Sequence, residues 1–187
     1  MGRWAPNSAA RLRQAAMELY SERGYERTTV ADIASRAGLT TRTFFRYFAD
    51  KREVLFAGTS TLQDTLTSAV EAAPSGTSPM DVVRVGLEAA ASWIGRDREH
   101  ARLRQAILDA TPELRERELS KLANLSTALT EALRRRGVDE DRARLAAEAG
   151  VLVLRLAFER WVGDGGDPDL SRTMRQTFDA LRALTSP

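Results

Sequence analysis

Apolar residues recur at helical spacing along almost the whole chain. In the stretch 8–23, for example, one helical face collects Leu12, Ala15, Ala16, Leu19 and Tyr20. No run alternates apolar and polar residues for long, so strands are not expected. The pattern predicts an all-α fold of about nine helices.

Capping signals set the first helix boundaries. Gly24 is expected to end the first helix, and Thr29 with Asp32 forms a capping box that opens a short second one. Gly38 closes that helix and Thr40 caps the next. A second box, Asp50 with Glu53, predicts a fourth helix starting there, whose apolar side would comprise Leu55, Leu62, Leu66 and Ala69.

A linker, residues 73–79, separates these helices from five more. Ser78-Pro79 caps the fifth helix, Thr111-Pro112 opens the seventh, and Asp167-Pro168 opens the ninth. The seventh helix is expected to turn four leucines inward, namely Leu119, Leu122, Leu129 and Leu133. This organisation predicts two domains, 7–67 and 68–187.

The two short helices joined at "AGLT" have the dimensions of a helix-turn-helix. In the second of them, "TTRTFFRYF", Phe44 and Phe48 lie four residues apart and share a face. They are expected to anchor the helix in a small core, while Arg42 and Arg46 point the other way. A plain three-helix packing unit with a basic surface would also fit this pattern.

Charge is unevenly distributed. Residues 1–52 hold ten Arg or Lys and five Asp or Glu, a net +5, whereas the remaining 18 basic and 21 acidic residues give −3. A basic end on a mildly acidic body suggests a polyanionic partner for that end, although uneven surface charge alone is the plainer interpretation.

Nucleic acid is a polyanion that this end of the chain could bind, because Arg can hydrogen-bond guanine and Thr offers a hydroxyl and a methyl group to base edges. Phe45 and Tyr47 could pack on sugar, phosphate or thymine methyl groups, and Lys51, Thr28 and Thr29 would reach phosphates. The predicted DNA-binding residues are Thr28, Thr29, Thr40, Thr41, Arg42, Thr43, Phe45, Arg46, Tyr47 and Lys51.

The stretch from Ala9 to Leu55 resembles the DNA-binding module of the TetR family of transcriptional regulators. The matching motifs are Gly24-Tyr25, Thr28-Thr29, Ile33-Ala34, Ala37-Gly38-Leu39, Thr43 to Phe48, and Lys51 with Glu53. The resemblance implies an N-terminal helix-turn-helix domain followed by a helical ligand-binding and dimerisation domain. Phe45 departs from the family's frequent Tyr, which removes a hydroxyl that could bond phosphate.

The linker and "FFRYF…REVLF" also resemble actinobacterial regulators of the mycofactocin type, which implies an acyl-CoA-like effector. By the same analogy, five residues are candidates to line an effector pocket, although each could equally be core or surface. They are Trp93, Leu103, Arg104, Phe158 and Trp161.

The eighth predicted helix is apolar nearly all round from Ala146 to Phe158. Such a helix is buried on most sides, either in the core of one chain or between two. The resemblance implies a homodimer through the last two helices, and Ala146, Ala149 and Gly150 are expected to allow close approach there.

The sequence contains few residues that would indicate a cofactor, metal or enzyme site. Cys is absent, His100 is isolated in a polar helix start, and "GDGGDPD" lacks the spacing of a calcium loop, so no cofactor, metal or enzyme activity is expected. No membrane span or export signal is evident, which favours the cytoplasm.

The preferred hypothesis is an operator-binding regulator, and more specifically a repressor. A small effector would release it, with the fourth helix as the lever. The alternative is a helical protein-interaction adaptor without sequence-specific DNA binding.

Overall fold

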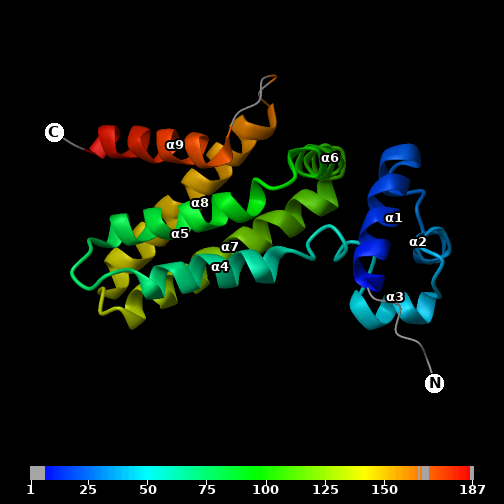
Figure 1. The fold of residues 1–187 in the computed structure, drawn as a ribbon, viewed down its shortest axis with the longest axis horizontal. Coiled ribbons are helices and arrows are strands. Elements are labelled where there is room, and N and C mark those ends of the chain that lie inside the picture. The colour runs from blue at the N-terminus through cyan, green and yellow to red at the C-terminus, as the bar shows by residue number, and fades with distance from the viewer. Residues whose placement is uncertain (1–6, 164, 166–168, 186–187) are drawn as a thin grey trace. The chain divides into compact units, whose positions relative to one another are not determined.

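The protein is seen in a computed structural model that describes residues 7–163, 165 and 169–185. All regular structure within those residues is helical, which confirms the predicted all-α class (Figure 1). The helices are α1 (Ser8–Arg23), α2 (Val30–Arg36), α3 (Thr41–Tyr47), α4 (Thr59–Ala72), α5 (Pro79–Ile94), α6 (Arg98–Asp109), α7 (Pro112–Arg135), α8 (Glu140–Gly163) and α9 (Leu170–Thr185). None of them is long and apolar enough to cross a membrane.

The chain forms two compact units, each made of two separate stretches. The head unit comprises Met1–Gly58 with Leu103–Glu116, and the body unit comprises Thr59–Arg102 with Arg117–Pro187. The second half of α6 and the first turn of α7 therefore belong to the head. The contiguous domains expected from the sequence, 7–67 and 68–187, stay a prediction.

Capping interactions form as the sequence predicts. The Thr29 hydroxyl accepts from the Asp32 amide at 3.2 Å, and Asp32 Oδ2 accepts from the Thr29 amide at 2.9 Å, which completes the box at α2. Ser78 caps α5 in front of a proline at its first position. Gly24 (φ 87°) and Gly38 (φ 63°) adopt the left-handed region that favours glycine, so α1 and α2 end where expected.

The prediction that a helix starts at Asp50 is wrong. Asp50 Oδ1 does accept from the Arg52 and Glu53 amides, but the chain then makes turns, and α4 begins only at Thr59. The reason is burial: the consecutive side chains of residues 54–56 all enter the head core, which one helical face could not achieve. Leu55 therefore packs in the head, not on α4.

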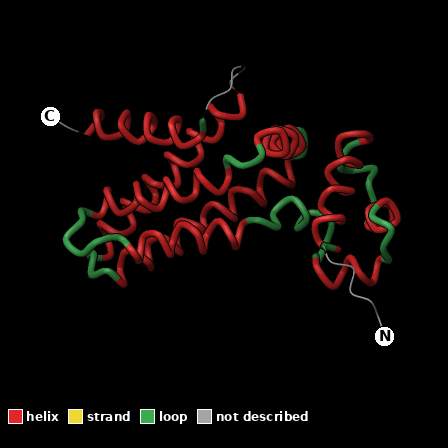
Figure 2. The backbone as a smooth tube through the Cα atoms, in the orientation of Figure 1, coloured by secondary structure: helices red, strands yellow, loops and turns green. Residues whose placement is uncertain are grey.

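The body core is built around α5, which packs against α4, α8 and α9 (Figure 2). Two glycines allow the close contacts. A Cβ at Gly86 would lie 2.9 Å from Val70 Cγ2 on α4, and a Cβ at Gly150 would lie 2.6 Å from Val83 Cγ1 on α5. The small residue Gly150 therefore serves packing within the chain, and the prediction that it lies between two chains is wrong.

The register predicted for α7 is wrong at one end. Leu129 and Leu133 are buried as expected and Leu122 is half-buried, but Leu119 is 62% exposed, and Leu125 takes an inward position instead. In the body, the buried leucines of α7 begin at Leu125, whereas Leu114 in the first turn is buried in the head core.

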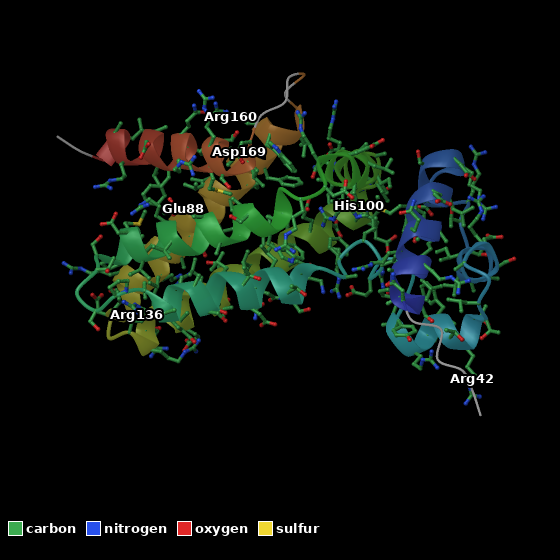
Figure 3. All side chains as sticks on the ribbon, in the orientation of Figure 1. Arg42, Glu88, His100, Arg136, Arg160 and Asp169 are labelled. Atoms are coloured by element: carbon green, nitrogen blue, oxygen red, sulfur yellow. The ribbon has the colours of Figure 1, made fainter. Side chains whose placement is uncertain are left out.

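Hydrogen bonds from Arg136, the residue after α7, stabilise the C-terminal end of α4. The guanidinium of Arg136 donates to the carbonyls of Glu71 (3.0 Å), Ala73 (2.8 Å) and Pro74 (2.9 Å), so it caps the C-terminus of α4 (Figure 3). Before α9, Asp169 Oδ1 accepts from the Ser171 amide at 3.0 Å. The expected cap at Asp167-Pro168 lies outside the described residues.

Candidate functional site

Helix α3 is held to the head by two aromatic side chains. Phe44 is fully buried and Phe48 is 8% exposed, and their ring centroids lie 5.5 Å apart in the head core. A helix of seven residues has too few hydrogen bonds to be stable alone in water, so these anchors fix its position. The outward face of α3 is therefore a rigidly placed surface.

That outward face carries the residues predicted to meet DNA bases. Thr41, Arg42, Phe45 and Arg46 are all exposed, and Arg42 extends away from the ribbon into solvent (Figure 3). Tyr47 is 36% exposed, and the Arg46 guanidinium lies 4.9 Å from its ring centroid. The structure thus brings two cations, a hydroxyl and two aromatic rings onto one accessible surface.

Three of the predicted threonines have hydroxyls that already serve the helix starts. Thr40 Oγ1 accepts from the Thr43 amide at 3.1 Å and lies 3.0 Å from the Thr43 hydroxyl. The Thr29 hydroxyl bonds Asp32, whose pKa is held below its usual value by the Thr29 hydroxyl and amide. Their role at DNA stays a prediction, and it would be to place the helix starts.

Thr28 must be removed from the predicted set. Its side chain is only 1% exposed, and its hydroxyl donates to the Gly24 carbonyl at 2.9 Å. A hydroxyl that is buried and already bonded does not reach a phosphate, so the contribution of Thr28 is to close the turn after α1.

Lys51 has a structural role that the sequence did not reveal. Its ammonium donates to the carbonyls of Tyr25 (2.9 Å) and Thr28 (3.1 Å) and lies 4.1 Å from the Tyr25 ring centroid. The Tyr20 hydroxyl donates to the Lys51 carbonyl at 2.7 Å, and burial raises the pKa of that hydroxyl. A phosphate contact by Lys51 stays a prediction, but most of its donors are already engaged within the head.

The α6–α7 corner, residues 103–116, packs into the head. Leu108 and Leu114 are fully buried in the head core. Arg104 Nε donates to the Leu55 carbonyl at 2.8 Å, and Arg52 pairs with Glu113 at 2.8 Å. These contacts could not be predicted from local sequence patterns, because they join residues about fifty or more positions apart.

The five predicted pocket residues do not form one group. Leu103 and Arg104 belong to the head unit, so a pocket formed by all five within the body is not what the structure shows. Trp161 is 2% exposed in the body core, with the Phe158 ring 5.9 Å away, and Trp93 is half-buried at the end of α5. The effector role of the three body residues stays a prediction.

Surface depressions do not coincide with those residues. One lies at the α7–α8 junction, between Glu131 and Glu140, and another lies beside α1 and α2 around Arg11 and Gly38. Within the described part of the chain, no cluster of His, Asp or Glu could hold a metal ion. The lone His100 is exposed near the start of α6, as expected (Figure 3).

Exposed leucines form a second surface feature. Leu145, Leu152 and Leu156 lie at spacings of seven and four on α8 and are 71%, 40% and 39% exposed. They share one side of the helix, opposite the buried Gly150 and Trp161. This exposed stripe could not be identified from the sequence, because α8 carries apolar residues on both its buried and its exposed side.

Comparisons with known proteins agree with this arrangement. Residues 12–57 match the family of bacterial regulatory proteins called tetR, and residues 77–185 match the MftR C-terminal domain. The chain is 28% identical over 179 residues to the HTH-type transcriptional regulator TcmR of Streptomyces glaucescens, covering 89% of this chain and 79% of that protein.

Two further relatives span nearly the whole length. A mycofactocin biosynthesis transcriptional regulator, MftR of Mycobacterium tuberculosis, is 25% identical over 186 residues, covering 98% of this chain and 93% of its own. The crystal structure of Thermus thermophilus FadR, a TetR-family repressor in complex with lauroyl-CoA, has a TM-score of 0.59 at 26% identity and covers 93% of both chains.

The Lys51 contacts generate a stability prediction. We expect Lys51→Met to lower the free energy of unfolding of the head by about 1–3 kcal/mol, because two partly buried carbonyls lose their donor. Urea unfolding followed by circular dichroism, with hydrogen exchange of residues 8–57, measures this. The control is Arg42→Met on an exposed side chain, which should change stability by less than about 0.5 kcal/mol. Equal stability of both variants would contradict the structural role.

Proposed function

The chain belongs to the TetR family of bacterial transcriptional regulators, with a C-terminal domain of the MftR type, and we propose that it is an operator-binding repressor released by an acyl-CoA-like effector. The observation that carries DNA binding is the outward face of α3, where Arg42, Phe45 and Arg46 are exposed on a helix anchored from behind. Such a helix fits the major groove, where side chains read base edges. We place this activity in the cytoplasm.

We propose a homodimer whose interface includes the leucine stripe of α8. Leu145, Leu152 and Leu156 expose a continuous apolar strip, which a monomer would leave in contact with water. The helix pair α8 and α9 packs within each body, so two copies would form a four-helix contact. A dimer also supplies two copies of α3, as a two-fold operator requires at a spacing of about 34–36 Å.

An acyl-CoA effector is supported by the relative that carries lauroyl-CoA and by the chemistry of the body. The body has an extensive apolar core, with Phe158 and Trp161 toward the end of α8, that could receive an acyl chain. Arg96 and Arg102 are exposed on either side of the start of α6, where they could meet phosphate groups. The other predicted aromatic, Trp93, stands three residues before Arg96.

We propose that effector binding reaches the head through the α6–α7 corner as well as through α4. The chain passes between the units three times: after Gly58, after Arg102 and after Glu116. The corner between the last two passages is fixed in the head by Arg104, which bonds Leu55, and by Glu113, which pairs with Arg52. A shift of α6 or α7 in the body would therefore act on the segment that follows α3, and operator affinity would fall by the difference in effector affinity between the two states.

Substituting Arg42 tests operator reading. On DNA from upstream of the protein's own gene, we expect Arg42→Ala to weaken binding by about 1–3 kcal/mol while binding to a scrambled duplex changes little. Fluorescence anisotropy at several salt concentrations measures both. Arg96→Ala, an exposed arginine in the body, is the control and should leave the preference intact. Equal losses on both duplexes would remove Arg42 as a base reader, and no preference in the wild type would favour the adaptor hypothesis.

The dimer proposal is tested with paired leucine substitutions. Leu152→Arg places a charge in the stripe, so we expect the dimer dissociation constant to rise at least about tenfold. Leu119→Arg alters an even more exposed leucine on α7 and should leave the dimer unchanged. Analytical ultracentrifugation of the 20.7 kDa chain distinguishes monomer from dimer. A stable Leu152→Arg dimer would exclude this face.

Coupling is tested with lauroyl-CoA as the probe. We expect it to weaken operator binding by the wild type about 5- to 150-fold, and Arg104→Ala to reduce that factor while leaving binding without lauroyl-CoA within about threefold. Gln105→Ala, next to it on α6, should behave as wild type, and free CoA should have no effect. Full release of Arg104→Ala would exclude the corner as the relay, whereas a wild type that ignores lauroyl-CoA would argue against the effector class.

A further inference from the structure

Phe45 is an apolar side chain that lies outside the head core and is largely exposed. Phe45 is 58% exposed on α3, directly before the exposed Arg46 and three residues after the exposed Arg42. We propose that Phe45 is a specificity-determining residue that reads the C5-methyl group of a thymine in the major groove. This inference rests on the proposed operator binding and names one base that the operator must contain.

The ring is held in a defined direction. Its centroid lies 5.6 Å from that of Phe44 at an interplanar angle of 83°, an edge-to-face contact of the kind that aromatic pairs prefer. Phe44 is itself fully buried and packs against Phe48. Contact with a buried neighbour favours this direction of the Phe45 ring, which reduces the rotamer freedom it would lose on meeting DNA.

The chemistry of phenylalanine restricts what this ring can read. It has no hydrogen-bond donor or acceptor, so a guanine, cytosine or adenine edge gains nothing specific from it. The thymine methyl is the apolar group that distinguishes one base edge in the major groove. Water is displaced from both the ring and the methyl when they meet, which is favourable in proportion to the apolar area buried.

Neighbouring side chains support the same base. Thr41 lies one helical turn before Phe45 and adds its own methyl group to the same side, and it is exposed. Arg42 lies three residues before Phe45, which makes them neighbours on the helix surface. Since arginine pairs best with guanine, the surface predicts a thymine close to an arginine-bound guanine in each half-site.

Packing of the ring on deoxyribose is the competing contact, and it has a different signature. Sugars are the same at every position, so that contact would add affinity without preferring any base. A thymine methyl, by contrast, can be removed by itself, because uracil differs from thymine only in lacking it. The two contacts are therefore separable in one experiment.

The experiment uses the full-length protein and a duplex selected by it from random sequences. Each thymine of the selected half-site is replaced in turn by uracil, and dissociation constants are measured for wild type, Phe45→Ala and Phe45→Leu. We expect one replacement to raise the wild-type dissociation constant about fourfold or more. This factor corresponds to the free energy gained by burying one methyl group. The same replacement should change Phe45→Ala binding by less than about twofold, and Phe45→Leu should retain part of the sensitivity.

Controls separate the possible failures. Leu119→Ala shortens an exposed apolar side chain of the body and should leave the response at the Phe45-dependent thymine unchanged, and circular dichroism checks that each variant is folded. Sequence-specific binding in which every uracil affects wild type and Phe45→Ala alike would overturn methyl reading alone. If selection returns no preferred sequence, the proposed operator binding fails and this inference fails with it.

Discussion

The shortness of α3 is the constraint on which the head depends. Seven residues cannot form a stable helix in water, so the outward side chains have a fixed position only because Phe44 and Phe48 are buried behind them. The caps at Thr29 and Thr40 contribute by satisfying amides at the two helix starts. Every binding property proposed for Arg42, Phe45 and Arg46 therefore depends on apolar packing on the other side of the same turns.

Charge in the head is divided between folding and binding. Arg11 bonds the Ala37 carbonyl, Arg36 pairs with Glu18 and Glu22, and Lys51 bonds two further carbonyls. The net charge of +5 therefore overstates the number of side chains that can meet phosphate. Long-range attraction remains, because it depends on the summed field. The exposed cations of α3, Arg42 and Arg46, are the ones proposed to read the DNA sequence.

Local features of this fold could be predicted from sequence, and long-range ones could not. The caps at residues 29, 40 and 78 join residues three positions apart, so a short stretch of sequence contains both partners of each interaction. The turns at 51–58 depend instead on the burial of residues 54–56 in the head core, and the exposure of Leu119 depends on which side of α7 packs in the body, so both are decided by tertiary packing. The same holds for the candidate site: the face of α3 followed from helical spacing, whereas the burial of Thr28 did not.

The close packing of the body bears on how an effector could act. Val83 on α5 leaves no room for a Cβ at Gly150 on α8, and Val70 on α4 leaves none at Gly86 on α5, so α5 packs closely against both neighbouring helices. An acyl chain entering this core would have to separate helices, because protein interiors are close-packed and respond by shifts between discrete arrangements. Helix α4 runs directly from the head segment that ends at Gly58. In the proposed mechanism, a separation of α4 from α5 would therefore move the start of α4, which follows directly on this head segment in the chain.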